Sequence, residues 1–252
     1  AGSIGVLGTA ATCAAAGIIV GVVTLTGLGL KFSAIAIAYA GGSLVLTAVY
    51  TALIVWIVGL AVPVTASYII CAVIAAPALI QLGVPDYAAH MFIFYYAVLS
   101  EVSPPTALSP FAAAAITGAD PYRTTLQSWK YTMPAFLVPF VFVLDPNGVG
   151  LLLTVPKGGD WTQIAWVTIT TAIGIWAYAG ATQGWLFGKT GRAVQAALIL
   201  AGTLLLFPSL LDAISTTLGS EHLDLMKSVG IALTLALAVF QKMRAMAAKR
   251  AA

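Results

Sequence analysis

The sequence predicts an all-α polytopic integral membrane protein with six to seven membrane elements, and its composition is the first reason. Hydrophobic residues make up 61% of the chain and charged residues only 8%, whereas soluble domains carry about 25% charged residues. The 54 residues between Lys31 and Asp86 contain no charge, and neither do the 28 between Asp160 and Lys189. Because about 20 apolar residues span a bilayer, these stretches indicate a multi-pass protein embedded in lipid.

Net charge, cysteines and the first residues limit the function further. The net charge of +3 comes from basic residues in short loops and the tail, so nucleic acid is not an expected partner. Cys13 and Cys71 lie inside apolar segments and are expected to stay reduced. The opening residues lack a charged region and a cleavage site, which predicts no signal peptide. We expect the sequence to be a piece of a longer polypeptide.

The individual elements follow from apolar runs and from the glycines, prolines and charges that interrupt them. In chain order we expect a span over 9–26, an apolar arm over 32–40, apolar segments over 43–58 and 68–82, a broken span over 88–118, an amphipathic segment over 122–130, a kinked span over 131–144, a linker over 149–159, and spans over 161–188, 193–211 and 223–241. The tail carries Lys242, Arg244, Lys249 and Arg250. This basic tail predicts a cytoplasmic C-terminus.

The segment 43–82 allows two interpretations. Its apolar halves are separated by residues 59–67, which include Pro63 and no charged residue. The halves form either two full spans or a re-entrant hairpin, in which two half-length helices meet inside the membrane. We favour the hairpin, because its tip contains little loop chemistry and need not reach water.

The span 88–118 is interrupted by polar residues and by Pro104 and Pro105. A proline lacks an N–H and clashes with the carbonyl four residues back, and lipid tolerates such a break only where it faces protein or a polar cavity. Glu101 is the only charged residue between Asp86 and Asp120. Ionisable residues inside spans mark sites by default, so Glu101 is expected to carry a proton, bind a cation or pair with a basic gate. The alternative without a functional role is a neutral or water-exposed glutamate near the mouth of a cavity.

Both interruptions gather oxygen atoms where helical hydrogen bonds are lost. The freed carbonyls are expected at Gly59, Ser100 and Glu101, and hydroxyls lie nearby at Thr65, Ser67, Ser103 and Thr106. Hard cations bind such oxygens, helix N-termini attract anions, and secondary transporters combine the two. The alternative is a pair of ordinary kinks whose serines bond back to their own helix. No hydrolase, metalloprotease or P-loop motif is present, so an enzyme is not expected.

Four segments resemble the permeases of tripartite ATP-independent periplasmic (TRAP) transporters. GLAVPVTASY at 59–68 resembles their GxxxPxTAxY hairpin. FYYAVLSEVSPPTAL at 94–108 resembles the serine-acid-x-[TS]-P-P-x-A-L segment of the fused, TAXI-type branch, and AAAGIIVGVV at 14–23 and GADP at 118–121 are similar to the same branch. The resemblance covers about residues 10–146, and the last three spans resemble the C-terminal extension of fused permeases without a sharp motif.

The resemblance implies a secondary active importer that works by an elevator mechanism. Two inverted repeats would each contribute a hairpin and a broken span to a site at the membrane midplane. A periplasmic binding protein would deliver a small organic acid, and a gradient of Na⁺, or alternatively of protons, would drive import across the cytoplasmic (inner) membrane of a bacterium or archaeon. Many TRAP permeases outside the TAXI branch lack an acid at the position of Glu101, which assigns this residue to ion coupling. No cofactor is implied.

Carried onto this chain, the resemblance makes residues 1–148 the second repeat and residues 149–252 a C-terminal extension of three transmembrane helices. The first repeat is missing from the sequence and would be a partner. Expected contacts to substrate or ion come from Gly59, Pro63, Thr65, Ser67, Ser100, Glu101, Ser103, Pro104, Pro105 and Thr106, with Na⁺ held by Gly59, Ser100, Ser103 and Thr106. The alternative from another class is a structural or scaffolding membrane subunit without its own transport site.

Overall fold

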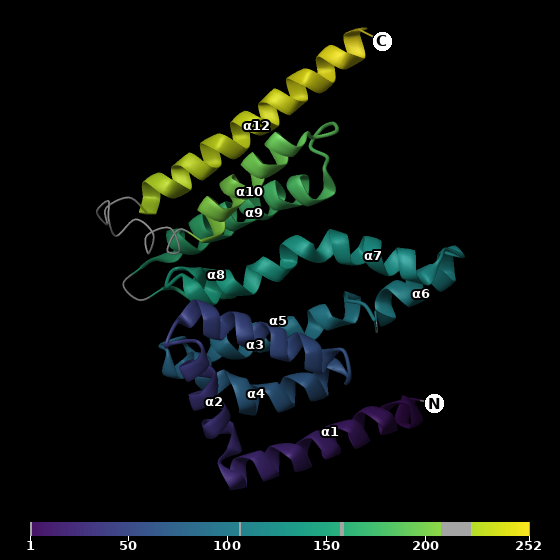
Figure 1. The fold of residues 1–252 in the computed structure, drawn as a ribbon, viewed down its shortest axis with the longest axis vertical. Helices are drawn as coiled ribbons and strands as arrows, with labels where there is room; N and C mark the ends of the chain where they lie inside the picture. The colour runs from purple at the N-terminus through teal and green to yellow at the C-terminus, as the bar shows by residue number, and fades with distance from the viewer. Residues whose placement is uncertain (1, 106, 157–158, 208–222, 252) are drawn as a thin grey trace. The chain divides into compact units, whose positions relative to one another are not determined.

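The computed structural model describes residues 2–105, 107–156, 159–207 and 223–251. Within these ranges the regular structure is helical apart from one isolated bridge between Trp185 and Lys189, which confirms the all-α prediction. The chain divides into two compact units, residues 1–129 and residues 130–252. Figure 1 shows the helices in order from purple at the N-terminus to yellow at the C-terminus.

The first unit is built around one central helix. Its elements are α1 (Gly2–Thr26), α2 (Leu28–Tyr39), α3 (Leu44–Gly59), α4 (Val64–Gln81), α5 (Asp86–Leu99), η1 (Ser100–Val102), α6 (Leu108–Thr117) and most of α7 (Pro121–Thr132). The central helix α4 packs against α1, α2, α3 and α5. Val55, Leu79, Phe92 and Ile93 are fully buried in this unit and form part of its core.

Glycines end the first two helices, as the sequence indicates. Gly27 separates α1 from α2 with φ of 65°, and Gly41 and Gly42 follow α2 with φ of 60° and 76°. These left-handed conformations suit glycine because it has no Cβ. The helix after Gly27 resumes at once, so the predicted arm over 32–40 begins four residues earlier than expected, at Leu28. The segments Cys13–Thr26 and Leu28–Tyr39 meet at an angle of 76°.

Few of the described helices are long and apolar enough to cross a membrane. Among those residues, α4 and α9 are long and apolar enough to cross a membrane, and the bent pair of α1 and α2 would make a third crossing. Helix α3, at 16 residues, is shorter than α4, at 18. The structure therefore bears out a helical membrane protein, whereas the number of six to seven elements and the hairpin over 43–82 stay predictions.

The second unit consists of short 3₁₀ segments followed by three longer helices. Its elements after α7 are η2 (Met133–Leu137), α8 (Val138–Leu144), η3 (Gly148–Leu152), α9 (Trp161–Gln183), α10 (Arg192–Leu206) and α12 (Leu223–Ala251). Helix α9 packs against η2, η3 and α10, and α10 packs against α12. Leu198, Leu205 and Leu206 of α10 are buried in the core of this unit.

Several helix ends in the second unit differ from the predicted bounds. The predicted kinked span over 131–144 consists of the end of α7, η2 and α8, and Pro134 and Pro139 lie at the first turns of η2 and α8. The linker over 149–159 begins inside the packed segment η3. The span over 161–188 ends at Gln183, where Gly184 adopts a left-handed cap. The span over 193–211 ends at Leu206, with 208–211 outside the described residues, and that over 223–241 continues to Ala251.

Candidate functional site

The two interruptions are real breaks in the helical backbone. Helix α3 ends at Gly59, and Pro63 precedes the first residue of α4. Because Pro63 has no N–H, the Gly59 carbonyl loses its helical donor, and no backbone N–H of the described residues donates to it. The second break follows α5 and η1, where Ser103 is extended, the Pro104–Pro105 bond is cis and Ala107 has φ of 34°. Figure 1 shows this gap between α5 and α6.

The two breaks meet at Gly59. A Cβ built on this glycine would lie 2.5 Å from Ser100 Oγ, 2.7 Å from Ser100 Cβ and 3.4 Å from Ser67 Oγ. Real Cβ atoms essentially never approach other atoms closer than 3.0 Å, so a larger residue at position 59 would force α3 away from η1. Ser67 lies on α4 and Ser100 on η1, which means that three predicted site residues from three elements surround one point.

The hydroxyl groups at this point keep unused hydrogen-bonding capacity. Ser67 and Ser100 are both fully buried. Ser100 Oγ donates to the Ala97 carbonyl over 2.7 Å, which uses its only hydrogen and leaves two lone pairs. Ser67 Oγ has no hydrogen-bond partner among the described residues. Buried polar side chains are normally satisfied, so an unpartnered serine beside another oxygen is a candidate ligand for a cation or a polar substrate.

Ser103 is held by a residue that the sequence did not single out. Trp56 Nε1 on α3 donates to Ser103 Oγ over 2.9 Å, and Ser103 Oγ donates to the Leu99 carbonyl over 2.8 Å. Trp56 also stacks on Trp129 of α7, with ring centroids 6.5 Å apart and planes 7° from parallel. A tryptophan inside an apolar helix is typical of packing, and its only signal was its position one turn before Gly59.

The Ser100 carbonyl, one of the predicted oxygen ligands, already accepts a backbone hydrogen bond. The prediction that the prolines leave the Ser100 carbonyl without a donor was wrong, because the backbone N–H of Ser103 donates to it over 3.0 Å. The break begins with a 3₁₀ turn, whose bonds span three residues instead of four, and this turn supplies the donor. The hydroxyls of Ser100 and Ser103 also bond back to their own helix, as the alternative interpretation expected, whereas that of Ser67 does not.

The remaining predicted site residues lie at the edges of the two breaks, except for one that is outside the described residues. Pro63 and Thr65 are exposed at the start of α4, Glu101 and Pro104 are half-buried, and Pro105 is exposed. Thr106 lies outside the described residues. A neighbouring contact joins α4 to α5, where Tyr68 Oη lies 3.1 Å from His90 Nδ1. The structure therefore brings Gly59, Ser67 and Ser100 together and places the other described residues at the edges of the two breaks.

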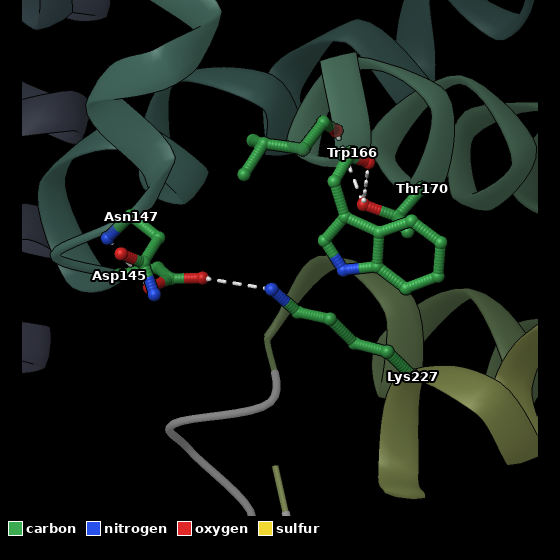
Figure 2. A network of polar contacts seen from close by, with 6 residues as sticks. Asp145, Asn147, Trp166, Thr170 and Lys227 are labelled. Atoms are coloured by element: carbon green, nitrogen blue, oxygen red, sulfur yellow. Dashed lines mark hydrogen bonds and ion pairs between the residues drawn. The ribbon is translucent and has the colours of Figure 1, made fainter. Parts of the chain in front are cut away.

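The second unit contains a polar contact of a different kind. Lys227 Nζ of α12 lies 3.5 Å from Asp145 Oδ2, and the two side chains are only 8% and 7% exposed. Asp145 Oδ1 also accepts the backbone N–H of Asn147 over 2.9 Å. Figure 2 shows this ion pair between the turn after α8 and the start of α12. The two residues are far apart in the sequence, and neither was predicted to pair.

The comparisons with known proteins identify one relationship. The family described as the DctM component of the tripartite ATP-independent periplasmic transporter matches residues 6–147, which is more than half of the 252 residues. No curated protein matches the chain. No solved structure matches it either. Both breaks and Asp145 lie within the matched residues, whereas α9, α10 and α12 follow them.

Proposed function

This chain belongs to the family of DctM components of tripartite ATP-independent periplasmic transporters, and we propose that it forms part of the translocation path of a secondary active importer. The family is one of membrane transporter components and not of enzymes. The proposed cargo is a small organic anion, such as a carboxylate, that enters together with a coupling ion. Transport would proceed by an elevator movement of the site across the cytoplasmic membrane, with the C-terminus of the chain on the cytoplasmic side.

The meeting of Gly59, Ser67 and Ser100 is the observation that carries this proposal. A close crossing of two interrupted helices brings the hydroxyls of Ser67 and Ser100 beside Gly59, a residue whose carbonyl lacks a helical donor. Interrupted helices that expose oxygens to a shared point are the usual construction of ion and substrate sites in secondary transporters. The arrangement is closed to solvent, because both serines are fully buried.

We propose Na⁺ as the coupling ion, with the proton as the alternative. Na⁺ is a hard cation that favours carbonyl and hydroxyl oxygens, and Ser67 Oγ and Ser100 Oγ offer unused lone pairs near Gly59, whose own carbonyl lacks a helical donor. Ser103 would complete the set, together with Thr106. Glu101 follows Ser100 directly and is half-buried, so its carboxylate would serve ion coupling, either by neutralising the cation or by carrying a proton.

The wider assembly follows from the same family membership. We propose that residues 1–148 are the second of two inverted repeats, of the TAXI-type fused branch, and that residues 149–252 are its C-terminal extension. A first repeat with its own hairpin and broken span would supply the other half of the site. A periplasmic binding protein would deliver the organic acid. A matching pair of interrupted segments in the upstream coding sequence would support this arrangement, and its absence would favour a scaffolding subunit.

Uptake by proteoliposomes tests the proposed function. Vesicles containing the permease that includes this chain, with its binding protein, would be offered labelled small carboxylates under imposed Na⁺ or pH gradients. Overpacking a buried contact costs about 1–3 kcal/mol, so Gly59→Ala is expected to reduce uptake by about fivefold to 150-fold. Gly17→Ala is the matched control, because a Cβ there meets nothing within 4 Å. Glu101→Gln is expected to change the ion dependence of uptake.

Three outcomes of this experiment would count against the proposal. Uptake that ignores both gradients would exclude a secondary active mechanism. Normal uptake by Gly59→Ala would show that the close crossing is unimportant for transport. An unchanged rate and unchanged ion dependence in Glu101→Gln would remove this carboxylate from the coupling mechanism.

A further inference from the structure

We propose that Trp56 is a positioning residue that sets the ion affinity of the break by holding the hydroxyl of Ser103. This inference rests on the proposed function, because it concerns the same ion site. Trp56 belongs to α3, whereas Ser103 lies where the backbone leaves η1. The hydrogen bond between them is therefore a side-chain link from the first arm of the predicted hairpin to the broken span.

The chemistry of the two groups fixes the direction of this link. An indole N–H can only donate, whereas a hydroxyl has one hydrogen and two lone pairs. Ser103 Oγ gives its hydrogen to the Leu99 carbonyl over 2.8 Å and accepts Trp56 Nε1–H over 2.9 Å. One lone pair is left, and its direction is determined by the two bonds already made. Trp56 thus presents a single oriented acceptor from an otherwise rotatable hydroxyl.

The surrounding contacts hold Trp56 itself in place. Its indole stacks on Trp129 in a nearly parallel arrangement, and it lies one helical turn before Gly59, which lies beside Ser100. Ser103 is fully buried and its backbone N–H bonds to the Ser100 carbonyl. A shift of Trp56 would therefore disturb Ser103, and through it the carbonyl of Ser100 beside the meeting point. Trp56 acts through these oxygens without being a ligand.

A double-mutant cycle in the purified permease that includes this chain tests this role. The protein would be placed in lipid nanodiscs, and its thermal stability measured while NaCl replaces choline chloride at constant ionic strength. Loss of one hydrogen bond costs about 1 kcal/mol, so Trp56→Phe is expected to raise the half-saturating Na⁺ concentration about fivefold. Ser103→Ala is expected to raise it at least as much. Because Trp56 acts through Ser103, the double variant should be no worse than Ser103→Ala alone.

The matched control is Trp176→Phe, which alters an aromatic pair of the second unit, that of Trp176 with Phe187, and leaves the bond to Ser103 in place. It is expected to leave the half-saturating Na⁺ concentration unchanged. An unchanged value in Trp56→Phe, or additive effects in the double variant, would overturn the proposed role of Trp56. A parent protein that shows no response to Na⁺ at all would instead refute the proposed ion site, and the role of Trp56 would fall with it.

A spectroscopic measurement covers the case in which Trp56→Phe does not fold. In the parent permease labelled with ¹⁵N-tryptophan, the indole N–H signal of Trp56 reports its hydrogen bond directly. The signal is assigned as the indole resonance that moves most in Ser103→Ala. During a Na⁺ titration it is expected to shift with the same midpoint as the thermal stability. A signal that stays in place while Na⁺ stabilises the protein would contradict the inference.

Discussion

In residues 1–129 the buried polar side chains at the two breaks are serine hydroxyls, and Ser67 Oγ has no partner among the described residues. In residues 130–252 one buried polar contact joins two side chains of opposite charge, Asp145 and Lys227. Unpaired oxygens cost stability unless a ligand fills them, whereas an ion pair is complete without any ligand. Under the proposed function, the first unit binds cargo, whereas the polar contact of the second unit holds the protein's own helices together.

The largest expected effect concerns the ion pair. Lys227→Met would leave the Asp145 carboxylate buried without its partner, and breaking a buried pair in this way costs about 3–5 kcal/mol. We expect the free energy of unfolding to fall by this amount, as measured by denaturant titration followed by circular dichroism. The double variant Asp145→Asn, Lys227→Met should recover most of the loss, because Asn keeps an acceptor for the Asn147 N–H.

If the two units differ in this way, substitutions of Asp145 and Lys227 should not change cargo binding. If the ion pair is structural, the double variant should respond to Na⁺ as the parent does. A single variant as stable as the parent would show that Asp145 and Lys227 do not depend on each other. A double variant that has lost its Na⁺ response would move part of the binding site into the second unit.

The next prediction concerns a smaller change in the free energy of unfolding, which should rise instead of fall. Ser67→Ala removes a buried oxygen that has no partner, so stability without Na⁺ should stay equal or rise by about 1 kcal/mol, while stabilisation by Na⁺ should decrease. Ser33→Ala is the matched control, because Ser33 is equally buried but donates to the Gly29 carbonyl over 3.0 Å and to the Ile74 carbonyl over 3.2 Å. Thermal unfolding with and without Na⁺ measures both variants.

Ser33→Ala is expected to cost about 1 kcal/mol and to leave the Na⁺ response unchanged. The opposite pattern would weaken the comparison between the two units. If Ser67→Ala destabilises the Na⁺-free protein as much as Ser33→Ala does, the Ser67 hydroxyl has a structural partner and is not kept open for cargo.

The sequence was sufficient to locate the breaks because their causes are local. Pro63, Pro104 and Pro105 lack the N–H that continues a helix, and a carboxylate such as Glu101 is costly in an apolar segment. These rules placed the ends of α3 and α5 within one or two residues. They also selected Gly59, Ser67 and Ser100, whose closeness the structure then shows.

The contacts that the sequence did not predict depend on residues distant along the chain. Trp56 is 47 positions from Ser103, and an indole in an apolar helix carries no sign that its N–H has a specific acceptor. Asp145 is followed by a proline, and only the packing of α12 makes it a buried partner of Lys227. The prediction that the Ser100 carbonyl has no donor was wrong for a local reason. The missing N–H of the prolines does not predict that a 3₁₀ turn precedes them and supplies a donor.

The smallest expected effect concerns a carboxylate of the second unit that is exposed instead of buried. Asp160 caps the N-terminus of α9, where Oδ1 accepts the hydroxyl of Thr162 over 2.6 Å and its backbone N–H over 3.1 Å. The Thr162 hydroxyl, followed by the nearby backbone N–H groups, lowers the pKa of Asp160 below its ordinary 3.8. The cap therefore stabilises the folded state above pH 3.8, and this contribution is lost as the pH falls toward the lowered pKa.

Asp160→Asn is expected to keep most of the cap, since Asn is also a good N-cap residue, but to lose its pH dependence. The melting temperatures of the parent and of Asp160→Asn, measured from pH 6 to pH 3, should therefore converge as the pH falls, and Thr162→Val should weaken the trend. The difference should be slight because water screens an exposed charge. Loss of the Asp160 charge could instead lower the free energy of unfolding as much as loss of the Asp145–Lys227 pair does. Burial would then not explain the large contribution of the ion pair, and the contrast between the two units would lose its physical basis.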